Sequence, residues 1–213
     1  MGDLVIKAAG RGNMNIRTFE QKDMEEKMYE NNFYEPYLQK HTKPKIEDVI
    51  PYYLEGELKK TMLDFAAYAC TNKMPIRWAS ANRWKAMYKS KVICWICLPE
   101  SLDSHYKHIC LCLNNLTMYE DTIKNEGLQN YIWNNVKVCR NVLYGSCNSH
   151  GTAPGRNEKI LGKDYKNVCH LKNYFPVYTP NEIDIDCIKK LLELEKQARD
   201  TVHLANKTKL MNV

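Results

Sequence analysis

Apolar and polar residues alternate in the middle of the chain in a pattern that predicts antiparallel β-strands. In the run Arg83–Tyr88 every second residue falls on the same face of a strand. One face carries Trp84, Ala86 and Tyr88, and the other carries Arg83, Lys85 and Met87. The pair Ser90-Lys91 separates this run from the next apolar run, which is hairpin spacing.

Further runs extend this pattern to a sheet of about four to six strands. Val92–Leu98 and Ile109–Leu113 are rich in residues that suit a half-buried pleated surface. Met74–Ala79 and Lys137–Leu143 are candidate strands before and after them.

A 3.6-residue apolar period predicts helices on either side of these strands. Pro51 and Gly56 separate a short helix at Ile46–Tyr53 from a clearer one at Glu57–Cys70. One face of the second helix carries Leu58, Met62, Phe65, Ala66 and Ala69, a stripe typical of a core-facing helix. Met118–Val136 is interpreted as helical pieces broken near Gly127.

The C-terminal segment predicts a long helix that covers one face of the sheet. Thr179 is the expected N-cap, Pro180 the first helical residue and Glu182 the partner in a capping box. The apolar face then continues to Arg199. The fold class is therefore α+β, an antiparallel sheet with helices packed on one face and a long helix at the C-terminus.

The organisation that we expect is a flexible leader at 1–17, an N-terminal helical arm at 18–45 and a single α+β domain at 46–213. The segment Tyr144–Asn173 is long and without clear periodicity, and segments of this kind are usually functional or disordered.

Composition places the chain among globular proteins of a reducing compartment. The chain has 213 residues, 44% of them apolar, and a formal net charge of +6. This modest charge does not indicate a nucleic-acid partner, because nucleic-acid binders usually concentrate more positive charge. No apolar run approaches the roughly 20 residues that span a bilayer. Met1–Gly12 has no signal-peptide core, and the nine cysteines are an odd number, so we expect a cytoplasmic protein with reduced thiols.

Aromatic residues on the predicted strands are the first candidate site. Trp78, Trp84, Tyr88 and Trp95 lie on neighbouring strands. Large rings with a polar atom line ligand pockets, but they also fill cores, and composition does not separate the two. The function that we expect is binding of a small apolar or aromatic molecule between the sheet and the helices.

Cysteines give a second candidate site. Cys94 and Cys97 form a C-x-x-C pair, but residues three apart in a strand point to opposite faces, so we interpret both as core residues. Cys110 and Cys112 share a face with His108, and packing is again the simpler interpretation. The segment from 139 to 170 gathers Cys139, Cys147, His150 and Cys169 with irregular spacing. These four residues are the candidate ligands of a zinc-stabilised interaction module, and structural or redox thiols are the alternative interpretation.

No motif of an enzyme is recognisable, so the enzyme class stays open. A small hydrolase in the aromatic pocket is the third hypothesis, and it requires a carboxylate or histidine with a shifted pKa beside the rings.

The chain contains three further motifs: W-x3-Y-K at Trp84–Lys89, C-x2-H-G-x2-P-G at Cys147–Gly155 and I-L-G-K-D-Y-x2-V-C at Ile160–Cys169. Together with the closing helix, these motifs resemble a group of uncharacterised bacterial proteins over Gly56–Arg199. Those relatives typically carry a closer cysteine pair before the Pro-Gly, where this chain has a lone Cys147. The layout is also similar to the GyrI-like ligand-binding group, a likeness that implies small-molecule binding.

Overall fold

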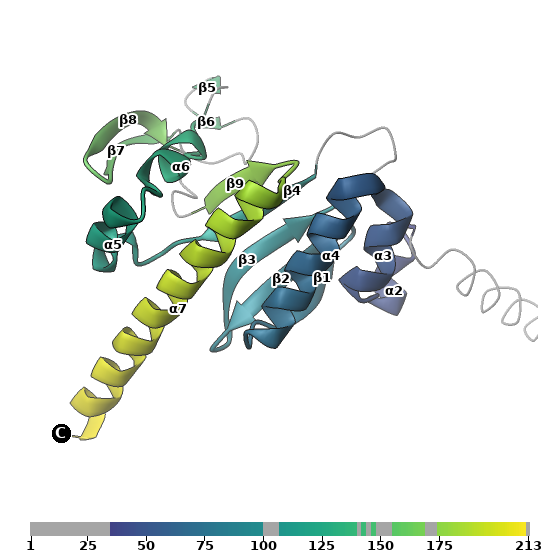
Figure 1. Cartoon of the computed structure of the whole chain (residues 1–213), viewed down its shortest axis with the longest axis horizontal. Coiled ribbons are helices and arrows are strands. Elements are labelled where there is room, and N and C mark those ends of the chain that lie inside the picture. Colours follow the sequence, from purple (N-terminus) through teal and green to yellow (C-terminus); the bar gives the residue numbers. More distant parts are fainter. Residues whose placement is uncertain are drawn as a thin grey trace, which may run out of the picture.

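A five-stranded antiparallel sheet forms the centre of the protein (Figure 1). The computed structural model describes residues 35–99, 107–139, 142–143, 146–147, 155–168 and 174–211. The strands occur in the order β1 (Ile76–Ser80), β2 (Arg83–Tyr88), β3 (Lys91–Cys97), β4 (His108–Cys112) and β9 (Tyr174–Tyr178). The predicted α+β class and antiparallel sheet are confirmed.

The register of the strands divides the sheet residues between two faces. On one face, Trp84 lies opposite Ile96, and Ile96 lies opposite Ile109. On the other face, Lys85 lies opposite Trp95, and Trp95 lies opposite Cys110. The predicted alternation along β2 and β4 is therefore confirmed.

The β2–β3 turn lies one residue earlier than predicted. Lys89 and Ser90 are the turn residues, with φ of 47° and 64°, and β3 begins at Lys91. Positive φ at both central residues is typical of a type I′ hairpin turn. Neither Lys nor Ser is a preferred residue there, which explains why the sequence signal is weak.

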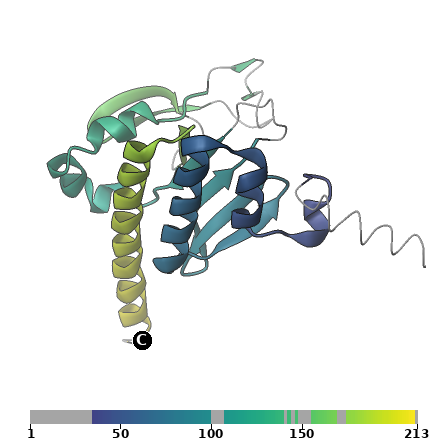
Figure 2. The same cartoon turned by 45° about the vertical axis from the view of Figure 1, so that its right-hand side comes forward.

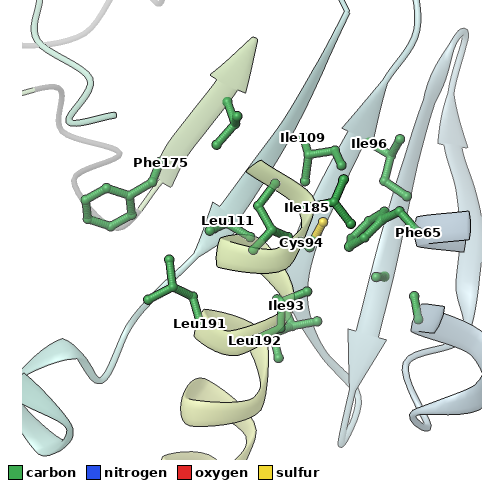
Figure 3. Close-up of a cluster of buried hydrophobic side chains, with 14 of the residues drawn as sticks. Phe65, Ile93, Cys94, Ile96, Ile109, Leu111, Phe175, Ile185, Leu191 and Leu192 are labelled. Carbon is green, nitrogen blue, oxygen red and sulfur yellow. The ribbon is translucent and has the colours of Figure 1, made fainter. Parts of the chain in front are cut away.

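Three helices cover the face that carries Trp84 and Ile96. They are α3 (Ile46–Tyr53), α4 (Gly56–Thr71) and α7 (Glu182–Met211), and α4 and α7 lie side by side across the strands (Figure 2). Their apolar faces meet the sheet, as predicted from their periodicity. Figure 3 shows this core, with Phe65 of α4 and Ile185, Leu191 and Leu192 of α7 facing Ile93, Cys94, Ile109 and Leu111.

Helix α7 begins two residues later than predicted. The Oδ1 of Asn181 accepts a 2.9 Å hydrogen bond from the backbone N of Asp184, and the Oδ2 of Asp184 accepts a 3.0 Å bond from the backbone N of Asn181. This reciprocal pair is a capping box with Asn181 as N-cap. Thr179 has a positive φ of 47° and lies outside the helix, so the predicted N-cap at Thr179 is wrong.

The segment between β4 and β9 forms a smaller second layer at one end of the sheet (Figure 1). It contains the 3₁₀ helix η1 (Leu116–Met118), α5 (Glu120–Asn125), α6 (Gln129–Asn134), the short pair β5 (Val142–Leu143) and β6 (Ser146–Cys147), and the hairpin β7 (Arg156–Ile160) and β8 (Lys163–Val168). The predicted break near Gly127 is confirmed, since this residue has a φ of 70° between α5 and α6.

The predicted strand at Lys137–Leu143 does not join the main sheet within the described residues. Val138 forms an isolated antiparallel bridge with Val168, and β5 pairs with β6. The fifth strand of the sheet is instead β9, which pairs with β4.

The described end of the predicted N-terminal arm contacts the sheet directly. The short helix α2 (Gln39–Thr42) buries Gln39, whose Oε1 accepts a 2.9 Å hydrogen bond from the backbone N of Asn82 in the β1–β2 turn. Residues 1–34 lie outside the described part, so the leader and the rest of the arm stay predictions. Within the described residues, no helix combines the length and the apolar character that a membrane span requires.

Candidate functional site

The four predicted aromatic residues lie in different environments. Trp84 is buried in the core with 1% of its surface exposed, and its Nε1 donates a 2.9 Å hydrogen bond to the carbonyl of Pro44. Trp78 lies opposite Trp84 on the edge strand β1, and its Nε1 donates a 3.3 Å bond to Gln39. Tyr88 ends β2, and its hydroxyl donates to the carboxylate of Asp200 on α7 at 2.9 Å.

Trp95 lies on the other face of the sheet. It is half-buried, and its register partners are Lys85 and Cys110, whereas the partner of Trp84 in β3 is Ile96. Since Trp84 and Trp95 point away from each other across the sheet, the four rings do not line one common cavity. The period of two in β3 could have revealed this, because Cys94 and Ile96 alternate with Trp95.

The C-x-x-C pair also spans both faces of the sheet, as predicted. Cys94 lies opposite Ala86 and Leu111 on the helix-covered face, and Cys97 lies opposite Arg83 and His108 on the other. Burial raises the pKa of the Cys94 thiol well above its ordinary value and that of Cys97 to about 11. Because the reactive form of cysteine is the thiolate, both thiols are suited to packing rather than to redox chemistry.

The predicted zinc ligands are only partly covered by the described residues. His150 and Cys169 lie outside them, and the side chain of Cys147 in β6 does too. Cys139 is half-buried, and its backbone N donates a 2.7 Å hydrogen bond to the carbonyl of Asn167. Within the described part of the chain, no three His, Cys, Asp or Glu residues gather in a way that could hold a metal ion.

A histidine with a shifted pKa lies on the same face as Trp95. Burial, together with the positive charges of Lys137 and Arg83, lowers the pKa of His108 to about 4. The ring of Tyr178 lies 5.3 Å from that of His108. A general base works best with a pKa near the operating pH, so a neutral imidazole with this low pKa is a weak base and does not favour the hydrolase hypothesis.

A cleft of about 530 Å³ lies between the main sheet and the β7–β8 hairpin. Its apolar lining consists of Leu113, Leu116, Ile160, Leu161 and Phe175. Its polar lining consists of Asn114, Thr117, Glu120, Glu158 and Lys159. The lining thus combines apolar and polar side chains in equal number. A volume of this size is typical of small-molecule sites.

The β7–β8 turn positions the apolar wall of the cleft. Leu161 and Gly162 are the turn residues, with φ of 49° and 84°, and the side chain of Leu161 is buried. A leucine with a positive φ is uncommon, because its Cβ crowds the backbone there. Two hydrogen bonds hold the turn to α6: Nε2 of Gln129 donates to the carbonyl of Leu161 at 3.0 Å, and Nε1 of Trp133 donates to that of Ile160 at 2.9 Å.

The charged residues around the cleft differ in whether they form an ion pair. Glu120 forms a 2.8 Å ion pair with Lys124 one turn later on α5. Lys159 is exposed on β7 and forms no ion pair with another described residue. The cleft can therefore take an apolar body against Leu161 and Phe175 and a polar end beside Lys159 and its neighbour Glu158.

Comparison of the chain with protein-family models, with curated proteins and with solved structures finds no match. The resemblance to uncharacterised bacterial proteins and the GyrI-like likeness therefore stay predictions, and the function is argued from the cleft and its chemistry.

Proposed function

We propose that the protein binds a small molecule with an apolar or aromatic body in the cleft between the main sheet and the β7–β8 hairpin. The observation that carries the proposal is the apolar wall formed by Leu113, Leu161 and Phe175 in a cleft of about 530 Å³. The ligand class is the one expected from the sequence, but the site differs from the predicted group of aromatic residues. Lys159 and Glu158 would orient a polar end of the ligand.

The test uses the apolar fluorescent probe 8-anilinonaphthalene-1-sulfonate, which carries one negative charge. Leu161→Asn removes an apolar side chain from the cleft while keeping a residue that tolerates positive φ in the turn. Leu204→Asn is the matched control, since Leu204 on α7 is 63% exposed and does not line the cleft.

The expected result is saturable binding of the probe to the full chain, about tenfold weaker in Leu161→Asn, because burial of a leucine contributes about 1.5 kcal/mol or more. Leu204→Asn should bind like the unchanged protein. Circular dichroism establishes that both variants fold. Equal binding to both variants would overturn the proposal, as would absence of saturable binding.

A zinc-stabilised interaction module is the second candidate function, and a specific backbone arrangement favours it. Val138 and Val168 form an antiparallel bridge, and they directly precede Cys139 and Cys169 in the sequence. The hydrogen bond from the backbone N of Cys139 to the carbonyl of Asn167 holds Cys139 beside β8. Cys169, another predicted ligand, directly follows β8 in the sequence. Cytoplasmic location, with thiols kept reduced, belongs to the same proposal.

The metal hypothesis is tested by measuring zinc in the purified, reduced full-length protein. Cys139→Ser should lower the content from about one zinc per chain, whereas Cys70→Ser should leave it unchanged, since Cys70 is exposed on α4. A zinc-free protein, or equal content in the two variants, would contradict the hypothesis.

A further inference from the structure

The face of the main sheet opposite to α3, α4 and α7 carries a group of cations. Arg77 in β1 lies opposite Lys85 in β2, and Arg83 stands two residues before Lys85, so the three side chains share this face. Arg77 and Arg83 are exposed, and Lys85 is half-buried. The sequences of the five strands contain no Asp or Glu. The strands therefore supply no carboxylate that could compensate the three cations.

The same cations have no partner within the part of the chain that the structure describes. Arg77, Arg83 and Lys85 form neither an ion pair nor a side-chain hydrogen bond with a described residue. Lys137 adds a fourth positive charge near this face, because burial and then the charges of Lys137 and Arg83 lower the pKa of His108. Positive charge is thus concentrated here, which the modest net charge of the whole chain does not reveal.

A tryptophan lies next to these cations with its ring partly exposed. Trp95 occupies the central strand β3, directly opposite Lys85, and is half-buried. The indole N–H groups of Trp78, Trp84 and Trp133 each donate a hydrogen bond within the protein. That of Trp95 donates none to a described residue. Trp95 is therefore the tryptophan whose ring and N–H group are both available to a ligand.

The aromatic surface continues to the far edge of the sheet. His108 in β4 lies opposite Tyr178 in β9, and their ring centroids are 5.3 Å apart. Tyr178 is 49% exposed. Adjacent strands lie about 4.8 Å apart, so the face extends over about 19 Å from β1 to β9. A surface of this length, with cations at one edge and rings across the middle and the other edge, fits an extended polymer better than a compact ligand.

We propose that this face binds single-stranded RNA. Its phosphates would lie against Arg77, Arg83 and Lys85, and an unpaired base would stack on Trp95. An acidic peptide would match the cations but offers no base to stack on the indole ring. A duplex keeps its bases stacked on one another, whereas loops and ends of RNA present unpaired bases to aromatic side chains.

The first test measures the contribution of the ring. A fluorescein-labelled RNA of 12 nucleotides, without self-complementarity, is titrated with the full chain and followed by fluorescence anisotropy. Trp95→Leu should weaken binding about tenfold, because stacking of one base on an aromatic side chain contributes at least that order of affinity. Trp95→Phe keeps a ring and should retain most of the affinity. Circular dichroism establishes that both variants fold.

The second test measures the contribution of the cations and does not depend on the folding of the tryptophan variants. For a single strand, each neutralised phosphate adds about 0.7 to the slope of log affinity against log salt concentration. Lys85→Gln should therefore flatten this slope by about 0.7. Lys166→Gln, an equal change of charge at an exposed residue of β8 outside the main sheet, should leave the slope unchanged.

Absence of RNA binding would overturn the proposal, as would equal affinities of Trp95→Leu and Trp95→Phe or equal slopes of Lys85→Gln and Lys166→Gln. Competition by poly-glutamate as strong as that by unlabelled RNA would assign the face to an acidic peptide instead. Tighter binding of DNA or of a duplex of the same sequence would also contradict the assignment to single-stranded RNA. The cleft variant Leu161→Asn should keep its RNA affinity, which separates this inference from the proposed ligand site.

Discussion

Nε of Arg199 donates a 2.8 Å hydrogen bond to Oε1 of Glu195, one turn earlier on α7, and the two side chains are 8% and 0% exposed. Nη2 of Arg199 also donates to the carbonyls of Val92 and Cys112, at 3.1 and 3.2 Å. This buried pair therefore joins the long helix to the ends of two neighbouring strands.

Removal of one partner of this pair should destabilise the protein strongly. Arg199→Met leaves the Glu195 carboxylate buried without its cation, and we expect a loss of about 3–5 kcal/mol in the free energy of unfolding. Urea denaturation followed by circular dichroism measures this loss. The control is Lys60→Met, which breaks exposed ion pairs with Glu57 and Glu182 and should change the urea midpoint very little. Equal losses of stability in Arg199→Met and Lys60→Met would contradict the burial of the Glu195–Arg199 pair.

The two tryptophans on opposite faces of the sheet should respond differently to substitution. Trp84→Ala removes a fully buried ring from the core and leaves the carbonyl of Pro44 without its donor, at an expected cost of about 3–5 kcal/mol. Trp95→Ala should cost clearly less, because Trp95 is only half-buried. Thermal unfolding of both variants makes the comparison, and a larger loss for Trp95→Ala would show that the faces are wrongly assigned.

Local sequence patterns predicted the first four strands because each pattern lies within a few residues. Alternation in Arg83–Tyr88 and the apolar run at Ile109–Leu113 depend only on burial of one or both faces. The fifth strand, β9, was missed because Pro176 stands at its centre and proline is a poor central-strand residue. The sheet tolerates it because β9 is an edge strand.

The cleft could not be predicted in the same way, because its walls come from distant parts of the chain. Leu113, Leu161 and Phe175 meet only through the tertiary fold. The β7–β8 hairpin that supplies Leu161 is mostly exposed and charged, so its strands carry little hydrophobic periodicity. The turn of this hairpin also lacks the usual sequence signal, because Leu161 stands where Asn or Gly is typical.

Stability should fall in acid partly through His108. The pKa of this residue in the folded protein is about 4, below the ordinary value of 6.5, because burial and the nearby Lys137 and Arg83 disfavour the charged form. Between pH 6.5 and 4 the unfolded chain therefore binds a proton that the folded protein does not. The contribution of His108 to the free energy of unfolding is fully present above pH 6.5. It decreases by about 3 kcal/mol as the pH falls to 4.

The variant His108→Gln isolates this contribution from that of the carboxylates. Urea unfolding at a series of pH values between 7 and 4 should give a flatter pH dependence for the variant than for the unchanged protein. If the variant is the less stable protein at pH 7, the difference in the free energy of unfolding between the two proteins should decrease as the pH approaches 4. Parallel curves over the whole range would exclude His108 as a source of the acid sensitivity.

The β2–β3 turn should gain stability from a glycine. Ser90 has a φ of 64°, a conformation in which an L-residue with a Cβ is unfavourable, and glycine is preferred at this second position of a type I′ turn. Ser90→Gly should therefore raise the free energy of unfolding by about 0.5–1 kcal/mol, the net of relieved strain and the greater freedom of glycine in the unfolded chain. The matched substitution Ser80→Gly, in β1 at a residue without positive φ, should instead lower it. Urea midpoints of the two variants test the contrast, and a destabilised Ser90→Gly would mean that the turn conformation assigned here is incorrect.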